Sequence, residues 1–314
     1  MRFSTPMATA VEVVPRAVGL QRRRRMDLSG TLLRFILLGT VASSFLILGA
    51  LVSTIAADGL PVLSSRLGAF LSGTLRSFPE EAGISQGLRG TFWIGMVVVF
   101  LAFPAGIASA IYLEEYAPAT RFTRLININI RNLAGVPSIV YGILGFAIFV
   151  KALGGVSGGR SVVAGGLTLA ILVLPIVIIT AAEAIRAVPS ELRQASLGLG
   201  STRWQAVRRV VLPYAAPGIL TGTVLSLARA LGEAAPLILV GAVTDRLGSN
   251  PGILDVGSLR ERFTSMPSVI TTWAGQANPG FRANTAAAIL VLMAIVLLAN
   301  GAAIFMRNRF ENKR

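Results

Sequence analysis

The chain has 314 residues, of which 54% are hydrophobic and only 14% charged, and it carries 29 Lys and Arg against 14 Asp and Glu. It contains no cysteine and no histidine, which excludes a cysteine nucleophile, a serine–histidine triad and a zinc site built on imidazole or thiolate. Soluble domains carry about 25% charged residues. With a mean hydropathy of +0.71, the net charge of +15 therefore does not indicate a partner nucleic acid.

Six apolar runs are long enough to cross a bilayer, for which about 20 helical residues are needed. The predicted spans are residues 35–57, 91–113, 136–153, 162–182, 216–243 and 285–306. Pro104 and Pro175 lie inside two of them, and proline is tolerated in spanning helices where neighbours satisfy the freed carbonyl. The sequence thus predicts an all-α integral membrane protein with six transmembrane helices.

The basic residues are distributed unevenly between the two sides of the predicted membrane. With both termini in the cytoplasm, the inner segments carry 18 Lys and Arg and the outer segments 9. Because positive charge is retained on the cytoplasmic side, we predict that both ends face the cytoplasm. The Arg22–Arg25 cluster precedes an apolar run longer than the about 7–15 residues of a cleavable signal. We expect an uncleaved tail that sets topology, with contact to anionic lipid headgroups as the alternative reading.

The predicted organisation has four parts. Residues 1–29 form a basic cytoplasmic tail, and residues 30–90 hold the first transmembrane helix and an outer loop. Residues 91–306 form the core transmembrane domain, which contains a cytoplasmic loop at residues 189–213. Residues 307–314 form a short cytoplasmic tail.

The loop at residues 189–213 is predicted to hold two short helices separated by a glycine turn. The first begins after Pro189, which suits a helix start, and ends at Gly198. The second begins with a capping box formed by Thr202 and Gln205, and Pro213 ends it.

The second of these helices is predicted to be amphipathic. Trp204, Val207 and Val211 share its apolar face. Such a helix suits the surface of a bilayer and also suits docking to a cytoplasmic partner. The pattern alone leaves both readings open.

The same loop resembles a segment of the permease subunits of ABC importers, which reads Glu-Ala-Ala, three residues, Gly, nine residues, Ile, one residue, Leu-Pro. The matching positions are Gln194, Ala195, Ser196, Gly200, Val210, Leu212 and Pro213. Every spacing is kept, although Gln194 replaces the acid, Ser196 replaces an alanine and Val210 replaces the isoleucine. The resemblance implies that this loop docks into a groove on an ATPase subunit, and the lost acid puts an ion pair from that position in doubt.

Other stretches are similar to the permeases of phosphate-specific ABC importers. Residues 131–142 and 228–236 carry this similarity, while residues 112–116 and 278–281 look like the PstA-type subunit rather than its PstC-type partner. The resemblance covers about residues 85–306. It implies the MetI-like fold of a type I ABC importer permease in the bacterial plasma membrane, which translocates inorganic phosphate by alternating access.

The resemblance also implies a set of partners. These are a PstC-like second permease forming a heterodimer, PstB-like ATPase subunits that bind ATP and Mg²⁺, and a PstS-like phosphate-binding protein. No nucleotide motif occurs in this chain, so we expect no cofactor, no metal and no enzymatic activity of its own. A permease for another oxyanion or small solute, and a scaffold that does not transport, are the alternatives.

Two charged residues lie inside the predicted fifth span. Arg229 and Glu233 are four residues apart, which places them on one face of a helix. Gly222, Ser226 and Pro236 continue this face as a seam of small and polar residues. A charge at the bilayer centre costs at least about 2.5–3.5 kcal/mol, so the pair is expected to face another helix or water.

The pair has a functional and a structural reading. An arginine offers a planar fork that suits phosphate oxygens, and the acid would hold it in place and keep an empty path near neutral. The pair would then line the substrate pathway. The alternatives are an ion pair that clamps helices without touching substrate, and a gate that uses the pair without contacting phosphate.

Small residues also recur in the third span. Gly135, Ser138, Gly142 and Gly145 repeat at spacings of three and four, which favours close helix packing. Glu233 is the one acid deep in a predicted span, so the sequence offers no acid pair for an intramembrane enzyme.

Overall fold

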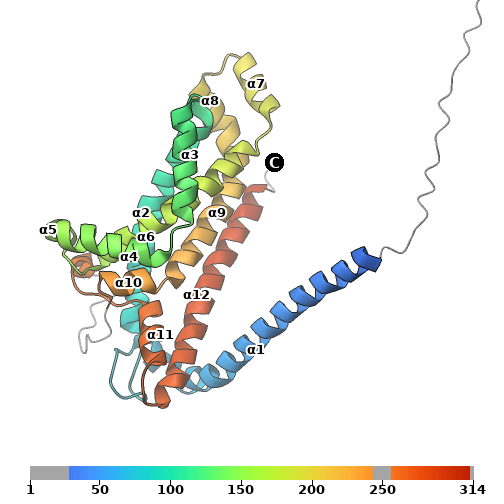
Figure 1. Cartoon of the computed structure of the whole chain (residues 1–314). Helices are drawn as coiled ribbons and strands as arrows, with labels where there is room; N and C mark the ends of the chain where they lie inside the picture. The colour runs from blue at the N-terminus through green and yellow to red at the C-terminus, as the bar shows by residue number, and fades with distance from the viewer. Residues whose placement is uncertain (1–27, 243–255, 312–314) are drawn as a thin grey trace, which may run out of the picture. The chain divides into compact units, whose positions relative to one another are not determined.

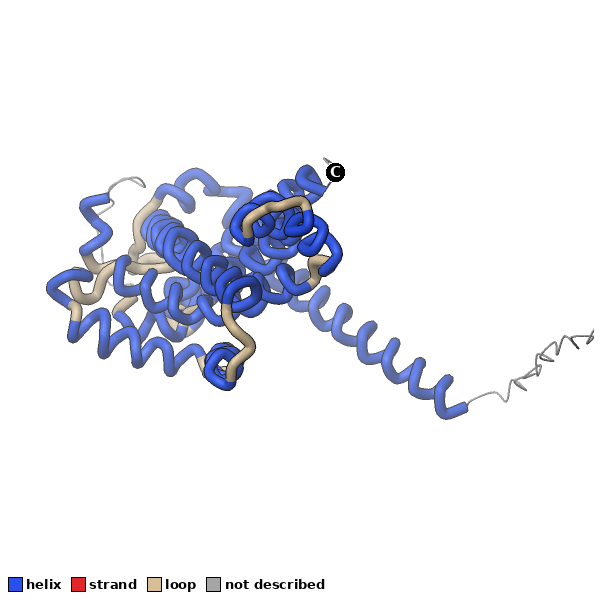
Figure 2. The backbone as a smooth tube through the Cα atoms, turned by 90° about the horizontal axis from the view of Figure 1, so that it is seen from above, coloured by secondary structure: helices blue, strands red, loops and turns tan. Residues whose placement is uncertain are grey.

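The computed structural model describes residues 28–242 and 256–311. Within these ranges every regular element is a helix and no strand occurs (Figure 2), as predicted for an all-α protein. The predicted basic tail lies outside the described residues up to residue 27, and so does the end of the C-terminal tail from residue 312. The four-part organisation stays a prediction.

The first helix, α1, is longer than the span predicted for it. It covers Leu28–Ser72, whereas the sequence predicted a span at 35–57 followed by a loop. Pro61 lies inside the helix, and its backbone departs from helical angles only at Arg66. Two helical segments therefore meet in a kink at Arg66, and the second buries Phe70 against Trp273, with the ring centroids 6.3 Å apart.

The chain divides within α1 into two compact units, Met1–Val52 and Ser53–Arg314. The described part of the first unit is a helical segment whose side chains are almost all exposed, including Phe35, Phe45 and Leu46. Apolar side chains exposed along a whole helix are typical of a segment that faces lipid. The second unit holds all the other helices and is described next.

Three long helices confirm the second, fourth and sixth predicted spans. They are α2 (Ser85–Ile111), α6 (Val162–Arg186) and α12 (Gly280–Glu311). Pro104 lies inside α2 and Pro175 inside α6, as predicted. A π-helical turn, η1 (Tyr112–Tyr116), extends α2.

The third predicted span, 136–153, is found as α4 (Ser138–Gly145) continued by the π-helical η2 (Phe146–Ala152). A helix that was not predicted, α3 (Arg121–Ala134), precedes it, with a bend of 99° between the two. Pro137 explains the bend, because the residue before a proline is driven out of helical angles. The described chain therefore has five helices able to cross a membrane, or six if the bent pair counts as one span.

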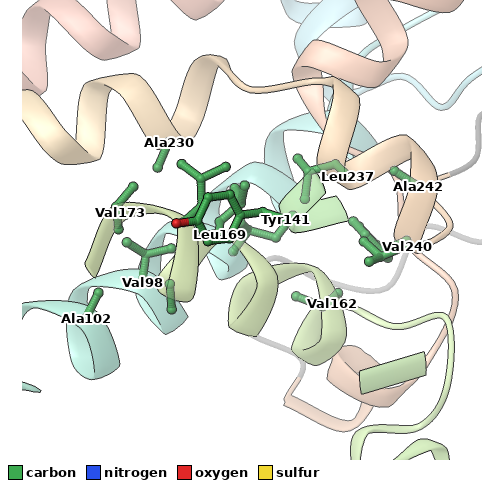
Figure 3. Close-up of a cluster of buried hydrophobic side chains, with 14 residues drawn as sticks. Val98, Ala102, Tyr141, Val162, Leu169, Val173, Ala230, Leu237, Val240 and Ala242 are labelled. Atoms are coloured by element: carbon green, nitrogen blue, oxygen red, sulfur yellow. The ribbon is translucent and has the colours of Figure 1, made fainter. Parts of the chain in front are cut away.

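Short elements connect the long ones. They are α5 (Gly154–Ser157), η4 (Val256–Arg260) and α11 (Met266–Ala274). The core of the second unit forms where α2, α4 and α6 meet, around Tyr141, Leu169 and Val173 (Figure 3). The hydroxyl of Tyr141 donates to the carbonyl of Leu133 at 2.9 Å, which ties α4 back to the end of α3 across the bend.

Candidate functional site

The predicted fifth span is broken at its charged pair. One helix, α9 (Leu212–Gly232), ends at this point, and a second, α10 (Ala235–Val240), begins two residues after Glu233. Glu233 itself has an extended backbone, with φ −79° and ψ 116°. The prediction of one continuous helix through residues 216–243 is therefore wrong. Pro236 in the first turn of α10 supplies a local reason, since it cannot donate a helical hydrogen bond to the preceding turn.

Arg229 and Glu233 nevertheless meet. The Nε of Arg229 lies 3.5 Å from Oε1 of Glu233, and 54% of the arginine side chain is exposed against 19% of the glutamate. The predicted ion pair is confirmed, but its position is at the end of α9 rather than on one face of a continuous helix. A cation in the last turn is favoured by the carbonyls that end the helix. The Arg229 side chain is thus held at a helix break with more than half of its surface exposed.

The seam predicted to continue this face separates into two parts. Gly222 and Ser226 are buried, and a Cβ on Gly222 would lie 2.4 Å from Oγ1 of Thr180 in α6. That part of α9 packs closely against another helix. The part at Arg229 instead presents its side chain outward.

Both broken spans come together near the pair. In Figure 1, α4 and α10 run side by side, and the two helices are in contact. A Cβ on Gly142 of α4 would lie 2.7 Å from the Cα of Pro236 in α10, so only glycine allows this approach. The helices that follow the two breaks, after Ala134 and after Gly232, therefore pack directly on each other. Discontinuous helices of this kind build substrate sites in other transporters.

The structure adds a second basic surface, on α3. Arg124, Asn127 and Arg131 line an open hollow of about 310 Å³ on this helix. The sequence missed it because these residues were placed in a loop. An amphipathic helix with three exposed arginines, Arg121, Arg124 and Arg131, suits a watery path or a partner subunit better than lipid.

The structure confirms most of what the sequence predicted for the loop at 189–213. The first helix, α7 (Ser190–Gly198), follows Pro189, and Gly200 turns the chain with φ +84°. The next, α8 (Arg203–Ala206), starts with the predicted capping box of Thr202 and Gln205.

Pro213 does not end the second helix, contrary to prediction. The chain continues from α8 through a π-helical turn, η3 (Val207–Val211), directly into α9. Pro213 lies just after this π-helical turn. One continuous path therefore leads from the loop to Arg229 at the other end of α9.

The residues of the ABC-permease motif occupy distinct positions. Gln194, Ala195 and Ser196 lie on α7, where the first two are exposed. Val210 lies in η3, whereas Leu212 and Pro213 begin α9. The predicted apolar face separates, because Val207 and Val211 are each 1% exposed while Trp204 is 54% exposed.

Comparison with known proteins gives the chain a family and a set of relatives. The model of the family described as binding-protein-dependent transport system inner membrane component matches residues 17–312. Phosphate transport system permease protein PstA 1 of Mycobacterium tuberculosis is 42% identical over 166 residues, covering 52% of this chain and 53% of that protein. The Haemophilus influenzae PstA is 30% identical over 83% of this chain and 86% of its own length. A probable ABC transporter permease, YqgI of Bacillus subtilis, is 34% identical over 63% of this chain and 65% of that protein. The chain thus spans between about half and two thirds of the first relatives it matches.

Solved structures show the same fold at low identity. A bacterial alginate ABC transporter, in complex with an alginate-bound periplasmic protein, aligns with a TM-score of 0.64 at 14% identity over 88% of this chain and 94% of that one. The inward-facing MetNI methionine transporter aligns with a TM-score of 0.54 at 18% identity over 73% of this chain and 94% of that one. These likenesses confirm the predicted MetI-like permease fold.

Proposed function

The chain belongs to the family of binding-protein-dependent transport system inner membrane components, and from this premise we propose that it is one permease subunit of an ABC importer for inorganic phosphate. The observation that supports phosphate as the substrate is the exposed side chain of Arg229 at a helix break, together with the phosphate permeases among the relatives. The importer works in the bacterial plasma membrane by alternating access.

The pair at the helix break has the chemistry that phosphate passage requires. Arg229 presents a planar, permanently charged fork that pairs with phosphate oxygens. Glu233 lies 3.5 Å away and lowers the positive field when the path is empty. A phosphate group that enters the path shares the guanidinium of Arg229 with the Glu233 carboxylate. Competition from this carboxylate then helps the phosphate to leave.

The partners follow from this role. A second, PstC-like permease completes the pathway, and a PstS-like binding protein delivers phosphate from outside. PstB-like ATPase subunits bind ATP and Mg²⁺ and dock on the loop that carries Gln194, Ala195 and Ser196. This subunit itself binds no cofactor and makes or breaks no covalent bond. Exposure of Leu197, Leu199 and Trp204 on the same loop supports docking there.

Replacing Arg229 by glutamine tests the pathway role. The change removes the charge but keeps a side chain that donates hydrogen bonds, so we expect phosphate uptake in proteoliposomes to fall to background while the ATPase subunits still co-purify. Arg282→Gln is the matched control, because Arg282 forms a comparable exposed ion pair with Asp58 at 3.2 Å. Normal uptake by the Arg229→Gln complex would remove the pair from the pathway.

A further inference from the structure

The end of α2 carries two adjacent acids whose side chains are mostly covered. Glu114 is 15% exposed and Glu115 9% exposed, and both lie in the π-helical turn η1. Single π-helical turns frequently mark functional positions. Covered carboxylates need partners, and each of these finds one on a different element.

Glu115 binds an arginine of the ATPase-docking loop. Its Oε1 lies 2.9 Å from Nε of Arg193, the residue directly before Gln194 on α7. The two remaining nitrogens of this guanidinium donate to the carbonyls of Ile185 and Val188, each at 2.6 Å. One side chain therefore joins α7, the C-terminal end of α6 and the end of α2.

The neighbours of Glu115 extend this set of contacts. Glu114 forms an ion pair with Arg186 at the end of α6, with Nε 3.2 Å from Oε2. On the other side, the guanidinium carbon of Arg203 in α8 lies 5.6 Å from the centre of the Tyr116 ring. Three consecutive residues thus contact three arginines, on α6, α7 and α8.

These contacts matter because α7 packs only lightly on the rest of the described chain. It touches η3 and α8, but none of its residues is buried. By contrast, η3 buries Val207 and Val211 among apolar side chains. A turn containing Gly200 at φ +84° separates α7 from α8. The backbone of this turn therefore transmits little of a displacement of α7 to α8.

We propose that residues 114–116 form a clamp that fixes the ATPase-docking loop to the ends of α2 and α6, so that the loop and both helices move as one body. Glu115 and Arg193 are its central positioning residues. The proposal rests on the proposed function, because it assigns the clamp the task of transmitting ATPase movement to the pathway. Without the clamp, α7 would follow its ATPase partner while α2 and α6 lagged behind.

Cysteine cross-linking tests the clamp directly, because the chain has no native cysteine. The complex with Glu115→Cys and Arg193→Cys loses the ion pair, and a thiol-specific bifunctional reagent of matching length replaces it with a covalent link. The readout is the increase in ATPase rate on adding phosphate-loaded binding protein. We expect the uncross-linked complex to lose this stimulation by about 5- to 150-fold, the usual span of a coupling between sites, and cross-linking to restore it.

Two other results would overturn the proposal: unchanged stimulation before cross-linking, or stimulation that stays lost once the link has formed. Glu81→Cys, an exposed acid just before the other end of α2, controls for the reagent and should behave as wild type throughout. If wild type itself shows no stimulation, the proposed function fails rather than the clamp.

A charge exchange keeps the test independent of cysteine chemistry and of folding. Glu114→Arg alone places two arginines against each other, and we expect it to lower the stimulation. Adding Arg186→Glu restores an ion pair of reversed polarity and should recover at least half of the wild-type stimulation. Recovery is the signature of a pair that holds the ends of α2 and α6 together within the clamp, and failure of the double variant to exceed the single one would contradict the clamp.

Discussion

Replacing Gly142 by alanine tests whether the meeting point of the two broken spans sets the geometry of the charged pair. The added Cβ would lie 2.7 Å from the Cα of Pro236 and 2.8 Å from Cδ1 of Leu239. Ordinary van der Waals contact begins at 3.4 Å, so α10 must retreat from α4 by about 0.7 Å.

A displacement of this size acts on stability and on transport. Overpacking costs about 1–3 kcal/mol, and the better helix propensity of alanine recovers up to about 1 kcal/mol. Glu233 lies only two residues before α10, so its carboxylate moves with the helix and the 3.5 Å contact to Arg229 is disturbed. Because a shift near 1 Å costs up to about 100-fold where groups must be aligned, we expect phosphate uptake to fall by about 10- to 100-fold.

The assay combines thermal unfolding of the purified complex with uptake in proteoliposomes. Gly301→Ala is the control, because nothing lies within 4 Å of a Cβ at that position of α12. We expect the control to match wild type in both measurements, and Gly142→Ala to unfold at a lower temperature and to transport poorly. Wild-type stability together with wild-type uptake in Gly142→Ala would refute the claim that this contact positions the pair.

Two further substitutions test local parts of the structure. Arg66→Met removes donors to the carbonyl of Pro79 at 2.6 Å and to Oδ1 of Asn284 at 2.7 Å. Charged hydrogen bonds contribute about 1.5–3 kcal/mol each, so the melting temperature should fall clearly. The control is Arg76→Met at an exposed position, which should leave the melting temperature unchanged. Thr202→Ala removes the cap of α8 at a cost of about 1 kcal/mol, which should speed amide hydrogen exchange at the start of that helix about fivefold, whereas Thr202→Ser should not.

Prolines show where the sequence predicted the fold and where it failed. Pro104 and Pro175 lie inside straight apolar runs and inside intact helices, whereas Pro236 follows a break in a run of similar composition. A proline in an apolar run therefore does not by itself tell a break from an intact helix. The contact of Pro236 with Gly142 comes from a different span and cannot be read from the neighbouring residues.

One part of the candidate site could likewise be predicted from the sequence, and another part could not. The ion pair of Arg229 and Glu233 was predictable because its residues are near in sequence and charged inside an apolar run. The pair of Glu115 and Arg193 was not, because these residues are 78 positions apart. Its only sequence signal is a pair of adjacent acids at the end of an apolar run.

Stimulation of the reconstituted complex tests the central claim most directly. The ATPase rate is measured with the binding protein and phosphate, sulfate or molybdate, each at the same concentration. We expect that phosphate stimulates the wild-type complex, that sulfate and molybdate do not, and that Arg229→Gln abolishes phosphate transport. Stimulation by sulfate or molybdate but not by phosphate would contradict the claim.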